Sequence, residues 1–169
     1  MANFLTGKIG AVALSAAFLL AGCSDADKPD NFMEEAARGG AAEVQLGLIA
    51  LQRSPNPDVK HYAQQMVDDH GRANAELAEL AGRKGVKLPR EISSKNQVLA
   101  AKLDKLSGEA FDKQYVDAML EDHEKDVKEF ETQSRVGSDS AVKAFAAKQL
   151  PVLQEHLQMI RDIKAKMAQ

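Results

Sequence analysis

The sequence predicts an all-α protein, an antiparallel four-helix bundle with an extra short helix in the connection between its two helix pairs. Composition is the first observation, because the 169 residues include no Trp and only 5% aromatic residues, whereas Ala, Leu, Glu and Lys, which favour helices, are frequent. The second is that no stretch alternates Val, Ile and Thr as a strand would. The third is that turn and capping residues divide the chain into long segments with helical apolar spacing.

The first two long helices are separated by a sharp turn. A helix over residues 31–53 is followed by Ser-Pro-Asn-Pro, in which Asn56 can cap the next helix and Pro57 can occupy its first position. That second helix is expected over 57–84, because Gly85 is a typical terminating residue.

The second half of the chain begins with a short helix. Ser93 or Ser94 can cap this polar helix, which is expected to end near Leu106. A long helix over 109–135 follows a Ser-Gly pair and ends before a glycine, and the last helix begins after Asp139 and continues nearly to the end of the chain.

The two halves share a pattern. Residues 59–63 and 142–146 both open helices after polar turns, with Val, Lys, an aromatic residue and Ala at comparable places. Two helical hairpins joined by a long connection are the way in which ferritin-like bundles are assembled. We therefore expect a ferritin-like bundle in one domain over residues 31–169.

The amino terminus has the features of an exported bacterial lipoprotein. Lys8 is the only charged residue before an apolar run over 9–20, which suits a signal-peptide core but is short for a membrane span of about 20 residues. The Leu-Ala-Gly-Cys sequence that ends at Cys23 matches a lipobox, so we expect residues 1–22 to be removed and Cys23 to be acylated, with palmitate as a typical acyl group. An uncleaved anchor helix with a chance cysteine is the alternative.

The residues after the lipobox suggest a location. Residues 23–30 are polar, contain Pro29 and read as a tether between lipid and domain. Ser24, rather than Asp, after the cysteine resembles the enterobacterial sorting signal for the outer membrane, so we expect a periplasm-facing protein of a Gram-negative envelope. Because Cys23 is the only cysteine, no disulfide can form within the chain.

Charge excludes one class of partner. The chain carries 22 basic and 25 acidic residues, a net charge of −3, and removal of Lys8 would make it slightly more acidic. No basic stripe with interleaved aromatic residues is present, so we expect no nucleic acid partner. The membrane, reached through lipidated Cys23, is the partner that the sequence predicts.

One motif occurs twice and points to a polar site in the core. Tyr-x3-Met-x2-Asp-His ends at His70 and again at His123, and in each copy Tyr, Met and His share one helix face. A third acid-His pair ends at His156, and Glu43 lies between glycines on the first helix. These four residues lie at or near the midpoints of their helices, so antiparallel packing would bring them to one level.

A metal ion would satisfy these four groups together. Burying a polar group without a partner costs about 1–3 kcal/mol, and one cation can bind three imidazoles and a carboxylate. This donor set suits zinc, iron or copper and argues against calcium and magnesium. The predicted metal ligands are therefore Glu43, His70, His123 and His156, and the alternative is a metal-free hydrogen-bond cluster of the same residues.

Three further residues are candidate extra ligands. Asp126 lies one turn after His123 and could supply a second carboxylate. Met66 and Met119 lie one turn before two of the histidines, and thioether ligands would favour copper, although Met on an apolar stripe usually fills the core. His61 lies on the opposite side of its helix from His70 and is expected to be solvated.

The acids next to the histidines are placed differently. Asp69, Asp122 and Glu155 each precede a histidine and point about 100° away from it, so we expect them to be solvated. The alternative is that one accepts a hydrogen bond from a ring on a neighbouring helix. Pro151 predicts a kink in the last helix, either as a tolerated bend or to turn His156 inward.

Several segments together resemble a known family. They are Gly-Ala-Ala-Glu-Val-Gln-Leu-Gly at 40–47, the segment 59–70, Phe-Asp at 111–112 with Tyr115, and Leu-Pro at 150–151 with His156. Over about residues 31–165 the chain resembles the exported bacterial family called domain of unknown function 4142. The resemblance implies a ferritin-like helical fold and an envelope location, and no established activity. The family's Glu and His positions fall on Glu43, His70, His123 and His156.

Two classes of function remain open. The first is a lipid-anchored envelope protein that binds one transition metal ion for storage, buffering, sensing or redox defence, and the second is a structural or interaction lipoprotein with a metal-free polar core. No catalytic residues are predicted, and an enzymatic role stays open but is the less favoured interpretation. A di-iron oxidase is disfavoured because its two Glu-x-x-His motifs are missing: Val67, Leu120 and Leu153 stand three residues before the histidines.

Overall fold

The computed structural model describes residues 28–169. The predicted signal peptide, the lipidation site Cys23 and most of the tether lie outside the described residues. Within the described part, none of the helices has the length and apolar character needed to cross a membrane.

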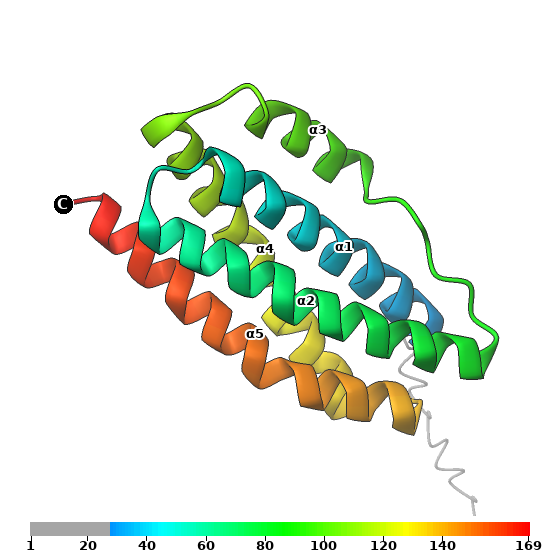
Figure 1. Cartoon of the computed structure of the whole chain (residues 1–169). Helices are drawn as coiled ribbons and strands as arrows, with labels where there is room; N and C mark the ends of the chain where they lie inside the picture. The colour runs from blue at the N-terminus through cyan, green and yellow to red at the C-terminus, as the bar shows by residue number, and fades with distance from the viewer. Residues whose placement is uncertain (1–27) are drawn as a thin grey trace, which may run out of the picture.

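Five helices follow one another along the chain (Figure 1). They are α1 (Pro29–Arg53), α2 (Pro57–Lys84), α3 (Ser94–Leu103), α4 (Gly108–Val136) and α5 (Ser140–Met167). The prediction of four long helices with a short one in the connection between the pairs is confirmed, and the described residues contain no strand. The expected end of α3 near Leu106 was wrong by about a turn, because the chain leaves the α-helix through tight i to i+3 hydrogen bonds of Lys105 and Leu106.

Capping side chains fix the helix starts. The Asn56 side-chain oxygen accepts hydrogen bonds from the backbone N–H groups of Asp58 and Val59, at 2.9 and 3.4 Å. Ser93, and not Ser94, caps α3, and Asp139 caps α5. Gly85 ends α2 with a φ of 71°, a left-handed conformation that glycine adopts without strain.

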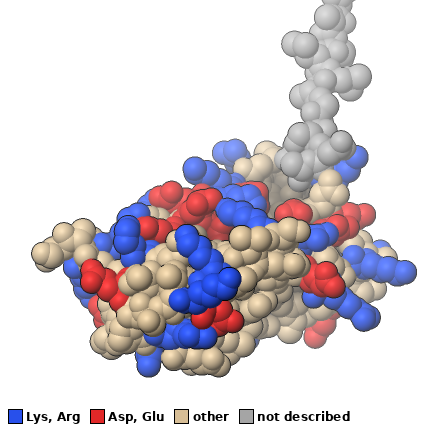
Figure 2. All heavy atoms as spheres, turned by 90° about the horizontal axis from the view of Figure 1, so that it is seen from above, with Lys and Arg blue, Asp and Glu red and all other residues tan. Residues whose placement is uncertain are grey.

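The long helices form two hairpins that pack together. α1 pairs with α2 and α4 pairs with α5, while α2 also contacts α5 and α1 contacts α4. The short α3 runs along the outside of α1 and α4 (Figure 1). Acidic and basic side chains are interspersed over the face seen in Figure 2, so the charge on this face is not segregated by sign.

Two apolar clusters fill the bundle, one toward each end. One cluster contains Tyr62, Phe111 and Tyr115, and the other contains Phe32 and Phe130. The predicted polar residues lie between these clusters in sequence on every long helix. The bundle therefore encloses a polar layer between two apolar ones.

A buried pair whose contact the sequence did not predict anchors the α1–α2 turn. The Ser54 hydroxyl donates a hydrogen bond to the Asp112 carboxylate at the start of α4, and the two residues are only 2% and 4% exposed. The hydrogen bond satisfies polar groups that would otherwise be costly to bury.

Close packing of α1 on α2 depends on Gly47. A Cβ atom at this position would lie 2.9 Å from the carbonyl oxygen of Ala63 and 3.0 Å from Val67 Cγ2. We expect Gly47→Ala to lower the free energy of unfolding by about 1–3 kcal/mol through overpacking, as measured by urea denaturation. Gly39→Ala is the matched control on the same helix, since its Cβ would meet only Asp126 Oδ2 at 3.9 Å. This control should gain up to about 1 kcal/mol from helix propensity, and equal effects of the two substitutions would contradict the packing argument.

Candidate metal centre

Three imidazoles and one carboxylate meet in the polar layer, one from each long helix. Glu43 of α1, His70 of α2, His123 of α4 and His156 of α5 are 2%, 7%, 0% and 1% exposed. One ring nitrogen from each histidine lies within 4.8 Å of those of the other two, and the ring centroids are 5.4–5.7 Å apart. The structure thus brings together all four residues that were predicted as metal ligands.

Glu43 is the negative centre of this group. Its Oε2 accepts a hydrogen bond from His70 Nδ1 at 2.8 Å, and its Oε1 lies 3.5 Å from His123 Nδ1. Burial alone would raise the pKa of Glu43, but the neighbouring His70 and His123 lower it to about 2. Glu43 is therefore ionised at neutral pH, and Oε1 has no hydrogen-bond partner.

His70 has one nitrogen engaged and one free. Its Nδ1 donates to Glu43, whereas Nε2 is buried without a partner among the described residues. Burial acts to lower the pKa of His70, but the Glu43 carboxylate outweighs it and raises this pKa above the usual range. Because the tautomer is set by Glu43, the lone pair of a neutral His70 ring is on Nε2.

His156 shows the same arrangement with the nitrogens exchanged. Its Nε2 donates to Asp69 Oδ2 at 2.9 Å, and Nδ1 is buried without a partner in the described part of the chain. Burial lowers the pKa of His156, although the hydrogen bond that this ring donates to Asp69 acts to raise it. The expectation that Asp69 is solvated was wrong, because its side chain is only 24% exposed and reaches across from α2 to the α5 ring.

His123 is the most deeply buried of the three. Its Nδ1 donates to the Met119 carbonyl oxygen one turn earlier, at 3.0 Å. The Tyr62 hydroxyl lies 3.3 Å from Nδ1 and 3.5 Å from Nε2, the latter at the outer limit of a hydrogen bond. Burial, reinforced by the other two histidines, lowers the pKa of His123 to about 4. The ring is therefore neutral at physiological pH, as a metal ligand must be.

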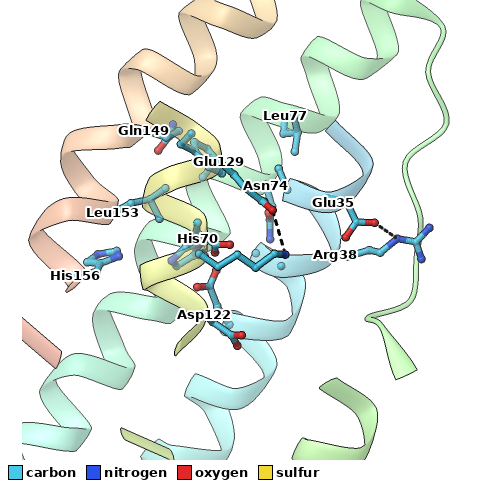
Figure 3. Close-up of a pocket in the computed structure, with 18 of the residues that line it drawn as sticks. Glu35, Arg38, His70, Asn74, Leu77, Asp122, Glu129, Gln149, Leu153 and His156 are labelled. Carbon is cyan, nitrogen blue, oxygen red and sulfur yellow. Dashed lines mark ion pairs between the residues drawn. The ribbon is translucent and has the colours of Figure 1, made fainter. Parts of the chain in front are cut away.

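A cavity of about 270 Å³ borders this group. His70, His156 and Glu43 form part of its wall, and α1, α2, α3 and α4 supply its charged side chains. In Figure 3, Gln149 and Leu77 lie toward one end and Asp122 toward the other, with His70 between them. The imidazole cluster is thus not sealed on all sides.

The other candidate residues divide into two groups. Asp126 lines the cavity, whereas Met66 and Met119 are fully buried in an apolar cluster. Burial and the nearby Glu43 and Glu129 carboxylates raise the pKa of Asp126 well above its usual range. The thioether side chains of these two methionines therefore fill space in the apolar core.

Comparison with models of known protein families shows which family this chain belongs to. The family model described as "Domain of unknown function (DUF4142)" matches residues 21–163. The chain belongs to the DUF4142 family. The resemblance carried by the sequence motifs is thereby confirmed, and a comparison with curated proteins finds no match.

Solved structures with the same fold have low sequence identity to this DUF4142 chain. A DUF305 protein from Streptomyces coelicolor, described as secreted, has a TM-score of 0.71 at 14% identity. The match covers 85% of this chain and 94% of that protein's chain. A DUF305 fragment from Deinococcus radiodurans has a TM-score of 0.72 at 16% identity, covering 82% and 95%. CopM in its Cu(II)-bound form has a TM-score of 0.68 at 13% identity, covering 82% and 97%. These similarities establish a shared helical fold.

Two features of this DUF4142 site are visible only in three dimensions. Tyr62 was recognised in the repeated motif but not as a neighbour of His123. The expectation that Asp122 is solvated was wrong as well, because its side chain is only 21% exposed and lines the cavity, with Lys95 3.8 Å away. Glu155 and His61 are exposed, as expected. Their positions on the outward faces could be read from helical periodicity, whereas contacts between helices could not.

Proposed function

We propose that this DUF4142 protein binds one transition metal ion through His70, His123 and His156, and that Glu43 orients His70 rather than binding the ion itself. The observation that carries the proposal is the set of unused ring nitrogens: His70 Nε2 and His156 Nδ1 are buried without hydrogen-bond partners in the described structure, and each of the three histidines has a nitrogen within 4.8 Å of one nitrogen of each of the other two. Unpaired buried acceptors are costly, and one cation would satisfy them at once. A second ion, bound as in di-iron bundles, would need two Glu-x-x-His motifs, which this sequence lacks.

Copper is the metal that we favour, with zinc and iron as the other candidates. Imidazole nitrogens bind all three, and the donor set argues against calcium and magnesium. CopM, a protein of the same fold, is known in a Cu(II)-bound form, which supports copper here. Because Met66 and Met119 lie among apolar residues, we propose nitrogen ligands rather than thioethers.

Two carboxylates would orient the rings. Glu43 and Asp69 accept hydrogen bonds from the N–H groups of His70 and His156, which directs the other nitrogen of each ring to the ligand. Such partners raise the basicity of the imidazole and hold its orientation.

Asp69→Asn should weaken metal binding roughly 10- to 100-fold, the usual effect of losing a partner of this kind. An amide can present its NH₂ group to His156 Nε2 and so favour the wrong tautomer. Asp68→Asn is the matched control, because Asp68 is exposed and pairs only with Gln64. Isothermal titration with copper(II) gives both dissociation constants, and equal constants would contradict the orienting role.

The cellular role that follows is a metal-buffering or storage protein outside the cytoplasm. We propose that Cys23 carries the lipid and that the bundle faces the periplasm from the outer membrane, which agrees with the lipobox pattern and with a described secreted protein of the same fold. The proposal includes no catalysed reaction.

Metal analysis of the purified protein tests the proposed function. Protein loaded with copper(II) and then desalted should retain one ion per chain, and His70→Ala and Glu43→Ala should each lose it. His61→Ala removes an exposed histidine from the same helix as His70 and should retain it. A native protein that remains metal-free after exposure to copper, zinc and iron would favour the metal-free structural role instead.

A further inference from the structure

We propose that the cavity beside the histidines is the entry path for the metal cation and that Asp126 takes up the ion on its way to them, releasing its proton to solvent as it does so. The inference rests on the proposed metal site, and it concerns how the ion arrives rather than what holds it. The buried ligands need such a path, because a hydrated ion cannot cross the apolar clusters that close the bundle toward both ends.

The cavity connects exposed side chains with the buried donors. Glu35, Lys95 and Glu129 are exposed and line it from α1, α3 and α4. His70 and His156, with their unpartnered Nε2 and Nδ1 atoms, line it from α2 and α5. An ion that enters beside these exposed side chains therefore reaches free nitrogen donors through the cavity.

The charge of the lining favours cations. Six carboxylates and three cationic side chains line the cavity; the carboxylates are Glu35, Glu43, Asp69, Asp122, Asp126 and Glu129. Arg38, Lys95 and Lys125 each lie within 4.0 Å of one lining carboxylate, namely those of Glu35, Asp122 and Glu129. Anionic ligands would meet a net negative wall, so the expected occupant is a hydrated divalent ion of the first transition row.

Asp126 is the carboxylate on this path without a counter-ion. Among residues 28–169 Asp126 forms no ion pair, and Lys125 only partly offsets the burial and the Glu43 and Glu129 carboxylates that raise the pKa of Asp126 well above its usual range. Its Oδ2 lies 3.9 Å from where a Cβ of Gly39 would be, and Gly39 is one turn before Glu43 on α1. Asp126 is thus placed to pass a cation from the surface to His70.

Apolar walls strengthen this attraction. Leu77, Phe130 and Phe145 line the same cavity, and low-dielectric walls focus the field of nearby charges. Charged clefts of this kind raise association rates, and the effect falls steeply with ionic strength. The unpaired Asp126 should therefore act mainly on the rate at which the metal binds.

Stopped-flow mixing of the purified protein with copper(II) tests the inference. The chain has two Tyr and no Trp, and Tyr62 lies beside His123, so quenching of tyrosine fluorescence reports arrival of the ion. At low salt, Asp126→Asn should lower the association rate constant about three- to tenfold. Lys125→Gln, which removes a cation from the same cavity, should raise it, and added salt should reduce both differences.

Glu109→Gln provides the matched control. It removes a carboxylate from the exposed start of the same helix, α4, and Glu109 does not line the cavity. An unchanged rate in this control, with opposite changes in Asp126→Asn and Lys125→Gln, supports the entry path. Equal rates in all four proteins, or an equal loss in Glu109→Gln, would overturn it while leaving the equilibrium stoichiometry, and with it the proposed function, intact.

Discussion

Copper(II) at about 100 times its dissociation constant should raise the unfolding midpoint of the protein by roughly 5 to 10 °C. A ligand that binds only the folded state contributes about 2.7 kcal/mol at that excess, and about 1 kcal/mol shifts the midpoint of a domain of this size by 2–4 °C. The donors come from α2, α4 and α5, which are separate in sequence, so the unfolded chain cannot present the same site. Differential scanning calorimetry measures the shift.

Substitution of a buried and of an exposed histidine provides the control for this effect. His123→Gln should abolish the shift, because His123 is fully buried and contributes one of the three clustered ring nitrogens. His61→Gln should keep it, since His61 is exposed on the outer face of α2. A shift of the same size in both variants would mean that copper acts at the surface.

Acidification of the metal-free protein should lower its stability, most steeply between about pH 6.5 and pH 4. The pKa of His123 is lowered from 6.5 to about 4 by burial, so the unfolded chain takes up a proton in this range and the folded chain does not. Stability that is present above pH 6.5 is then lost as the pH falls, by as much as about 3 kcal/mol. His156, whose pKa is also lowered by burial, acts in the same direction.

Two groups modify this dependence with known signs. The raised pKa of His70 adds stability below pH 6.5 that is lost as the pH rises, so it offsets part of the effect. Glu43, with a pKa lowered to about 2, adds stability that is lost only as the pH falls from about 4.5 toward 2. The net loss between pH 6.5 and 4 therefore depends chiefly on His123 and His156.

Urea denaturation of EDTA-treated protein at pH 7.5, 5.5 and 4.5 measures the effect. His123→Gln removes one of the two responsible groups, so its free energy of unfolding should depend less on pH than that of the wild-type chain. Parallel curves for the two proteins would contradict the assignment. The His61→Gln control should follow the wild-type curve, because this exposed ring is solvated in both states.

The fold could be predicted from the sequence because the helix-end residues and the apolar spacing indicated the same helices. Asn56, Pro57 and Gly85 mark helix ends by local chemistry alone, and apolar spacing gives the buried faces. The convergence of Glu43 and the histidines could be predicted because midpoints of antiparallel helices share a level. All of these inferences need only the sequence and the length of each helix.

Contacts between helices needed the structure. Asp69 was expected to be solvated from its direction on α2, but whether an outward residue meets a neighbouring ring depends on the rotation of both helices, which periodicity does not fix. The same holds for the cavity beside Asp126, because side chains from all five helices line it. Helix α3 ends earlier than expected because tight turns follow it, and the weak apolar periodicity of this helix does not indicate where it stops.

X-ray absorption spectroscopy of the copper-loaded protein is the most direct test of the central claim that the buried histidines bind a single ion. We predict one copper environment with three imidazole nitrogens, at one ion per chain, and loss of one imidazole in His156→Ala. A shell with oxygen ligands only, or a shell that is unchanged in His156→Ala, would contradict the claim.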